Sequence, residues 1–134
     1  LVAGQAFGYD FAKMPISTVF SINNMLRSPI SEHLESRMGA IVFNLFSIPE
    51  LIGPGIAFEC IIKQGFHVNE DYFYPEVINV CTQEPVGLGE MGELVLTSLA
   101  TQAMPIIRYR TGQLVELEKE PCLCGRNLVR LLTP

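Results

Sequence analysis

The fold class is decided by residues 28–46, which read SPISEHLESRMGAIVFNLF. Ser28 is able to cap a helix, Pro29 suits the first helical position, and Gly39 suits the residue that ends the helix. Between them an apolar side chain recurs every four residues, at Ile30, Leu34 and Met38. This spacing predicts a helix that packs against a neighbouring layer through one face.

A short apolar run, Ile41–Phe46, follows the helix directly. It is continuous and bounded by Gly39 and Ser47, which indicates a strand that is buried on both faces. A helix, a glycine turn and a buried strand in this order indicate an α/β layer. Gly53-Pro54-Gly55 then excludes regular structure and predicts a loop.

The pattern changes after residue 55. Short β-type runs alternate with turn residues, at 56–62, 76–81, 92–99, 106–109, 114–117 and 128–132. Pro85–Gly89 and Arg110–Gly112 are expected turns between these runs. We therefore predict two parts, residues 1–55 with α/β character and residues 56–134 as a β-rich subdomain, a small sheet or distorted barrel. In residues 1–27 only Ile16–Ile22 is strand-like.

Composition excludes several functional classes. The 134 residues carry a net charge of −5, and nine Lys and Arg are scattered, which disfavours nucleic-acid binding. No apolar run reaches the length of about 18 residues that a membrane span needs, and the N-terminal residues lack the basic segment of a secretory signal. A hydrophobic content of 49 % and a mean hydropathy of +0.31 suffice for a folded core. We expect a cytoplasmic protein whose four cysteines are thiols or metal ligands rather than disulfides.

Four residues form a candidate metal site. Cys122 and Cys124 flank one expected turn, and Cys60 and His67 flank another about sixty residues upstream. Two turns of a β structure are able to converge into a tetrahedral zinc site of three cysteines and one histidine, with no position left open for substrate. The alternative is a buried Cys60, a turn residue His67 and two free thiols. From the spacing alone both interpretations remain open.

Two further segments are candidate binding elements. Glu50 comes just after the predicted strand and before the 53–55 loop, where open α/β sheets bind ligands, so its carboxylate is a candidate Mg²⁺ ligand. The alternative is a solvated loop residue. Residues 104–113, MPIIRYRTGQ, end an apolar strand in a polar segment that is able to present backbone N–H groups and a guanidinium to an anion. The alternative there is a β-turn with charged neighbours.

From about residue 28 to its C-terminus the sequence resembles the phenylacetate-CoA ligase family, within the adenylate-forming superfamily. The resemblance covers roughly three-quarters of the chain and rests on an ordered set of pieces. These are Ile48–Gly55, Glu59-Cys60, Gly65–Asp71, Gly89–Thr97, Pro105–Gly112 and Cys122–Arg126. Each piece is weak alone, and their order and spacing are specific.

The resemblance implies ATP-dependent activation of a small carboxylate to an acyl-adenylate and transfer to CoA, with ATP/AMP, Mg²⁺ and CoA as ligands. It implies that Phe46 stacks on adenine and that Glu50 binds Mg²⁺. It places Tyr109, Arg110, Thr111, Gly112 and Gln113 at the nucleotide, and Cys60, His67, Cys122 and Cys124 at a structural Zn²⁺. Residues 1–55 then resemble the end of the α/β nucleotide-binding subdomain, and residues 56–134 resemble a β-rich subdomain of the same large N-terminal domain.

The sequence departs from the family pattern at the nucleotide site. Gln113 stands where the family has an Asp that grips the ribose hydroxyls, so the charge-assisted acceptor is lost. Ser47 stands where the family has Gly after the aromatic residue, and Pro49 stands where it has Ser or Thr before the Glu. Residues 21–24, SINN, lie where the family has Gly-Ala-Glu-Pro.

The resemblance also implies that the phosphate-binding loop and the C-terminal lid domain lie outside this sequence. We therefore expect a ligase fragment that is inactive alone. The alternative is a divergent, non-catalytic binding module stapled by zinc. A redox protein using Cys122 and Cys124 is disfavoured, because such proteins place C-x-x-C at a helix N-terminus.

Overall fold

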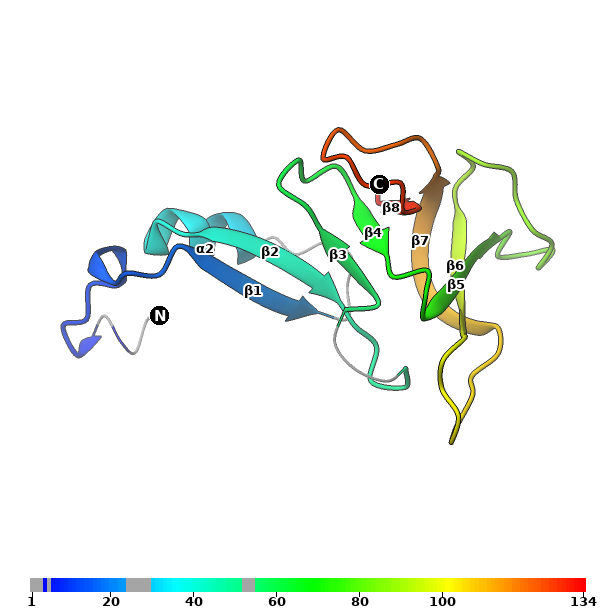
Figure 1. Ribbon diagram of the computed structural model, residues 1–134, viewed down its shortest axis with the longest axis horizontal. Helices are drawn as coiled ribbons and strands as arrows, with labels where there is room; N and C mark the ends of the chain where they lie inside the picture. The colour runs from blue at the N-terminus through cyan, green and yellow to red at the C-terminus, as the bar shows by residue number, and fades with distance from the viewer. Residues whose placement is uncertain (1–3, 5, 24–29, 52–54) are drawn as a thin grey trace.

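The computed structural model describes residues 4, 6–23, 30–51 and 55–134. Eight strands form one sheet in the order β1-β2-β3-β4-β8-β7-β6-β5 (Figure 1). The elements are the 3-10 helix η1 (Phe11–Lys13), β1 (Thr18–Asn23), α2 (Ile30–Met38), β2 (Ile41–Phe46), β3 (Ala57–Glu59), β4 (Phe66–Val68), β5 (Phe73–Ile78), β6 (Gly92–Ser98), β7 (Tyr109–Glu118) and β8 (Arg130–Leu132).

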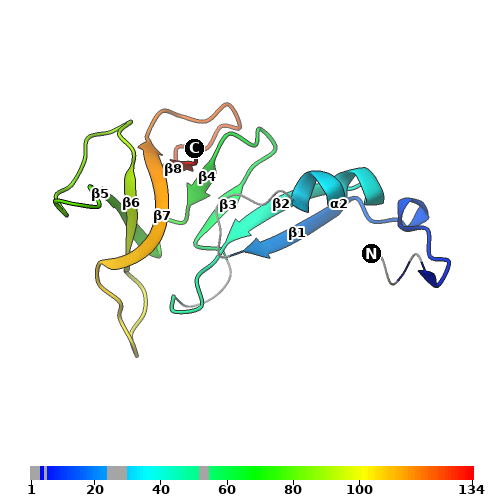
Figure 2. The same cartoon turned by 180° about the vertical axis from the view of Figure 1, so that it is seen from behind.

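The first part of the sheet is an α/β layer. β1 and β2 are parallel, with Thr18 opposite Ile41, and α2 connects them and lies along them in both views (Figures 1 and 2). The N–H of Gly39 bonds the carbonyl of Glu35 at 2.9 Å, and Gly39 adopts a φ of 63°, so the helix ends where the glycine predicts. Ser28 and Pro29 lie outside the described residues. The mixed α/β fold class is confirmed.

The burial of β2 differs from the sequence prediction. Its side chains alternate between buried and less buried instead of being buried on both faces. The buried Asn44 bonds Ser31 of α2, and the buried Phe46 packs in the main core cluster. On the other face Phe20 and Ile22 of β1 are 64 % and 60 % exposed, and Ile41 is 45 % exposed. The continuous apolar run thus includes one face that no described element covers.

The β-rich part differs from the prediction at several places. Strand β4 lies in no predicted run, and β3 ends at Glu59 within the run predicted at 56–62. Residues 106–109 and 114–117 are not two strands joined by a turn, because one strand, β7, runs from Tyr109 through the expected turn to Glu118. The run predicted at 76–81 is strand β5, which begins earlier and ends at Ile78. It ends there because the Asn79 side chain accepts the N–H groups of Cys81 and Thr82 at 2.8 and 3.1 Å and turns the chain.

The hydrophobic core joins both parts. Phe46, Ile48 and Leu51 pack in one buried cluster with side chains of the β-rich strands, among them Leu94, Leu96, Val115 and Leu131. β2 also pairs with β3, so the sheet and the core are continuous across residue 55. Within the described ranges, no helix has the length and apolar character needed to cross a bilayer.

Gly92 is the tightest point of the β5–β6 contact. A Cβ atom there would lie 2.4 Å from the carbonyl oxygen of Ile78 and 2.7 Å from Val77 Cγ1. Because the first of these is backbone, we expect Gly92→Ala to lower the free energy of unfolding by about 1–3 kcal/mol. The measurement is chemical denaturation. Gly87→Ala is the matched control, since the nearest atoms to its Cβ would be those of the flexible Glu90 carboxylate, at 3.4 Å or more. Equal stability of the two variants would contradict the prediction.

Candidate functional site

The structure brings the four Cys and His residues together. Cys60 directly follows β3, His67 lies in the middle of β4, and Cys122 and Cys124 lie on the turn that precedes β8. The two segments meet because β4 pairs with β8, with His67 opposite Arg130. The four ligand atoms all lie within 4.8 Å of one another, and three of the four residues are buried.

The separations within this cluster match those of a tetrahedral zinc site. Cys60 Sγ and Cys122 Sγ are 3.8 Å apart, and Cys124 Sγ is 3.5 Å from His67 Nε2. Bond lengths of about 2.3 Å for Zn–S and 2.05 Å for Zn–N put tetrahedral neighbours about 3.8 and 3.5 Å apart. A disulfide between Cys60 and Cys122 is excluded, because its S–S bond would be about 2.05 Å.

The environment adjusts the protonation of the cluster. Burial, followed by the charges of Arg126 and Arg130, lowers the pKa of His67 against a lesser opposing effect of the Leu128 backbone. Its imidazole is therefore neutral near pH 7, which is the form that binds metal. Burial raises the pKa of Cys60. For Cys124 burial also acts upward, but hydrogen bonds, first from the Arg126 backbone and side chain, outweigh it and lower the pKa to about 7.

Two arginines flank the cluster. Arg126 lies 3.5 Å from Cys124 Sγ through its Nη1 and sits over the Phe58 ring. Arg130 is buried and donates to the backbone carbonyls of Gln64 and Glu120 at 3.0 and 3.2 Å, and so ties together the two segments that carry the candidate ligands. Neither arginine forms an ion pair with a carboxylate in the described part of the chain.

The segment Tyr109–Gln113 forms a bulge in β7. Three residues, 111–113, lie opposite the single residue Leu94 of β6. The Thr111 hydroxyl donates to the Leu94 carbonyl at 2.8 Å, and the Gly112 N–H donates to Glu93 Oε1 at 3.1 Å. Gly112 has a φ of 71°, which favours glycine. Bulges of this kind re-aim side chains, here that of the half-buried Gln113.

Neighbouring residues of this segment point to different partners. Arg110 pairs with the buried carboxylate of Glu93 through both Nε and Nη2. Tyr109 lies beside Glu50 instead, and burial, followed by the charge of Glu50 and a hydrogen bond with it, raises the pKa of Tyr109. The structure therefore brings Glu50 and Tyr109 together and commits Arg110 to an internal ion pair.

Phe46 does not suit the role that the resemblance implies. Its side chain has no exposed surface and is part of the main core cluster. An adenine ring has no access to a side chain enclosed by core residues, so stacking on Phe46 is not supported in this arrangement. Glu50, by contrast, is exposed and lies one residue before the buried Leu51.

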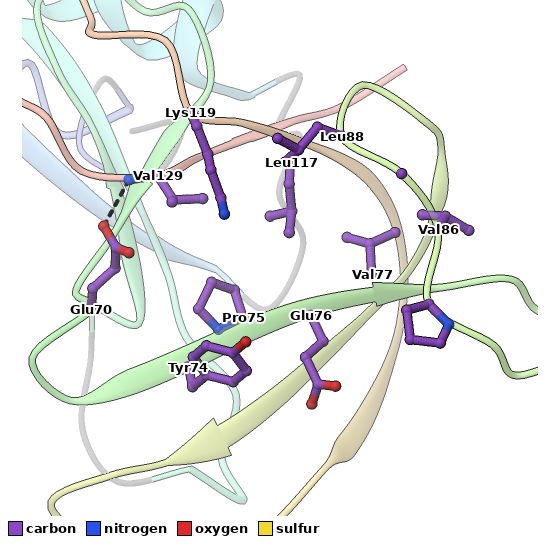
Figure 3. A pocket seen from close by; sticks show the side chains of 12 residues that line it. Glu70, Tyr74, Pro75, Glu76, Val77, Val86, Leu88, Leu117, Lys119 and Val129 are labelled. Atoms are coloured by element: carbon purple, nitrogen blue, oxygen red, sulfur yellow. Dashed lines mark hydrogen bonds between the residues drawn. The ribbon is translucent and has the colours of Figure 1, made fainter.

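Two hollows lie apart from the metal cluster. One of about 620 Å³ is lined by Gly55, by Asn69 and its neighbours Tyr72 and Phe73, and by residues 100–103. The other, of about 360 Å³, is lined by apolar side chains that include Val77, Leu117 and Val129, and the side chain of Lys119 extends between the last two (Figure 3). Glu70 is engaged there, since it accepts the Val129 N–H at 2.8 Å. No residue predicted as a site from the sequence lines these two, whereas Arg110 lines a third hollow of about 180 Å³.

Sequence reasoning missed several residues that support the candidate sites: Glu59, Glu93, Arg126 and Arg130. Arg126 could have been found, because it follows the Cys122–Gly125 turn directly and a cation there suits thiolates. Glu93 and Arg130 could not, because their partners lie across the sheet and become neighbours only through strand pairing.

Comparisons with known proteins support the resemblance. The chain is 43 % identical over 103 residues to a phenylacetate-coenzyme A ligase of Thermus thermophilus, over 76 % of this chain and 23 % of the relative. It is 46 % identical over 99 residues to the corresponding ligase of Aromatoleum evansii, over 73 % of this chain and 22 % of the relative. The chain thus spans under a quarter of these relatives. No protein-family model matches it.

Among solved structures, the fold matches that of 2-hydroxyisobutyryl-CoA ligase, seen in an open conformation in complex with 2-HIB-AMP and CoA. The TM-score is 0.86 at 21 % identity, over 98 % of this chain and 29 % of that chain. At this identity the match establishes the fold alone. The sequence matches confirm the resemblance to phenylacetate-CoA ligases over about three-quarters of the chain.

The Glu93–Arg110 pair predicts an acid-sensitive contribution to stability. Hydrogen bonds from Arg110 come first among the causes that hold the pKa of Glu93 below its ordinary value of 4.5. A depressed carboxylate pKa stabilises the fold above pH 4.5, and this contribution is lost as pH falls through the lower folded-state value. We expect Glu93→Gln to cost about 1–2 kcal/mol at pH 7.

Urea unfolding followed between pH 7 and 2.5 measures both effects. The difference between the wild type and Glu93→Gln should stay constant down to about pH 4.5 and shrink below it. Glu90→Gln, an exposed neighbour on the preceding turn, is the control. A difference that persists unchanged at pH 2.5 would contradict the assignment.

Proposed function

Because the chain is similar to a segment of phenylacetate-CoA ligases, we propose that it forms part of an ATP-dependent ligase that joins an aryl or acyl carboxylate to CoA through an acyl-adenylate. The observation that carries this proposal is the proximity of Glu50 to Tyr109. The two belong to segments about sixty residues apart that the resemblance assigns to the same nucleotide. Their proximity is what a shared site requires.

The residues of this chain support only part of such a site. Glu50 is an exposed carboxylate suited to Mg²⁺, and bound Mg²⁺ would supply charge neutralisation at the nucleotide phosphates. The bulge at 111–113 directs the side chain of Gln113, and an amide there is able to bond a ribose hydroxyl with less strength than a carboxylate. Arg110 stabilises the bulge rather than binding the nucleotide, since it forms an ion pair with Glu93.

We further propose that Cys60, His67, Cys122 and Cys124 bind a structural Zn²⁺. The matching separations support this proposal. Zinc with three thiolates and a neutral histidine carries a net charge of −1, and Arg126 and the buried Arg130 are cations that lack carboxylate partners in the described residues. With four protein ligands no position stays open for a substrate, so the ion stabilises the fold.

We place the protein in the cytoplasm, where cysteines persist as thiols or metal ligands. The partners we propose are the carboxylate, ATP and CoA, with no nucleic acid and no membrane. Residues 1–55 would complete the α/β subdomain, and residues 56–134 would form the β-rich subdomain that carries the zinc.

One observation favours a second function, a non-catalytic module stapled by zinc. Gln113 removes the charged acceptor that the family pattern has at the ribose, while the metal cluster is complete. Such a module would keep the fold and lose nucleotide binding.

Zinc content tests the metal proposal. We expect one zinc per chain by elemental mass spectrometry, and a fall to well under half of that in Cys60→Ser, because a ligand is lost. Cys81→Ser is the matched control, since Cys81 is exposed and outside the cluster, and it should keep one zinc per chain. Folded protein that has met no chelator and holds no zinc would refute the site.

A chimeric enzyme tests the ligase proposal. The part of this chain that matches the Thermus thermophilus ligase replaces the corresponding segment of that enzyme, and release of AMP with phenylacetate and CoA is measured. We expect weak activity, and Gln113→Asp should raise kcat/KM for ATP by roughly 10- to 100-fold, as restoring a hydrogen bond to a charged group implies. A folded chimera that stays inactive with either residue would favour the non-catalytic module.

A further inference from the structure

Strand β2 has an edge that β3 leaves partly unpaired. The two strands pair only at Leu45↔Phe58 and Phe46↔Ala57, and beyond Glu59 the chain turns away toward Cys60 and the metal cluster. The N–H groups of Val42 and Asn44 point to this side, since alternate residues of a strand share a direction and Phe46 bonds Ile56 there. Without partners these two N–H groups would weaken the strand.

Two carboxylates take the place of the missing strand. Glu59 Oε2 accepts the backbone N–H of Asn44 at 2.8 Å and its side-chain amide at 2.9 Å. Glu35 of α2 accepts the backbone N–H of Val42 at 2.9 Å. The Asn44 amide also donates to Ser31 of α2 at 2.9 Å, so the helix is tied to the same point of the strand.

Both carboxylates are attached to the hairpin that carries two candidate zinc ligands. Glu59 immediately precedes Cys60 in the chain. Glu35 forms an ion pair with Lys63, on the turn between Cys60 and His67, and this contact comes first among the causes that lower the pKa of Glu35. A shift of this turn would therefore move the acceptor of Asn44 and the partner of Glu35 together.

We propose that Glu59 and Glu35 are positioning residues through which metal binding at the Cys60–His67 hairpin fixes strand β2, and with it Glu50. The proposal rests on the proposed zinc centre. β2 ends at Phe46, and the buried Ile48 and Leu51 hold the short segment that presents Glu50 between them. A metal ion that orders the hairpin thus sets the position of Glu50, with which it has no bond.

Amide hydrogen exchange, measured by NMR on the whole chain, tests this coupling. Zinc-loaded protein is compared with protein stripped by a chelator, and zinc content is measured on both samples. We expect zinc removal to speed exchange at Val42 and Asn44 roughly tenfold more than at Leu94 and Leu96 of β6. Equal acceleration at all four amides, or none at Val42 and Asn44, would overturn the proposal. A chain that never binds zinc would instead overturn the metal centre on which it rests.

Variants separate coupling from simple stabilisation. By reciprocity, losing the contact must weaken zinc binding. We expect Glu59→Ala to raise the zinc Kd about tenfold. Glu59→Gln should raise the zinc Kd by a smaller factor, because its amide oxygen still accepts a hydrogen bond. Lys63→Met should also raise the zinc Kd by less than Glu59→Ala does. Glu32→Gln is the neutral control, because Glu32 is exposed on α2, the helix that carries Glu35. Gly92→Ala lies in β6, away from the hairpin. If it weakens zinc binding as much per degree of lost Tm as Glu59→Ala does, the effect is global stability and the proposal fails.

Discussion

The contact on which the rest of the structure depends is the meeting of two segments about sixty residues apart, where Cys60 and Cys122 approach to 3.8 Å. Closing so long a loop costs conformational entropy, and neither the short β4 nor the short β8 contributes many backbone hydrogen bonds. The pairing of these two strands nevertheless connects the first half of the sheet to the second. Arg130 and the cysteine cluster act at this junction, so it is held by side chains as well as by strand pairing.

A second constraint is the bulge in β7. A buried glutamate on β6 accepts from Arg110 and from the Gly112 backbone, and the Thr111 hydroxyl bonds the backbone of the opposite strand. These interactions keep three residues opposite one without breaking the sheet. In the sequence this segment has the appearance of a turn, because a glycine and two arginines interrupt the apolar pattern. In the structure the same residues form a bulge instead of a turn. Their partner on β6, Glu93, distinguishes the bulge from a turn.

Residues with local signals were predictable, and those with distant partners were not. Gly39 ended the helix as expected, since a helix end depends on a few neighbouring residues. The proximity of Cys60, His67, Cys122 and Cys124 was expected from the family resemblance, whereas their spacing alone left it open. The adenine-stacking role of Phe46 came from motif position alone, and the complete burial of this side chain, which depends on the whole core, does not favour it. The partial exposure of β2 was missed for a similar reason, since an apolar run does not reveal whether a layer covers its second face.

The location of Gln113 bears on whether the chain retains ligase chemistry. The bulge hydrogen bonds use the backbone N–H of Gln113, the side chains of Thr111 and Glu93, and the backbone of Gly112. The side chain at position 113 is therefore directed by the bulge without being needed to maintain it. A change from Asp to Gln at such a place alters the chemistry offered to a ligand and leaves the scaffold intact. The metal cluster and the bulge are thus able to persist whether or not a nucleotide binds. The fold alone is therefore no evidence of ligase activity. The side chain at position 113 bears directly on nucleotide binding.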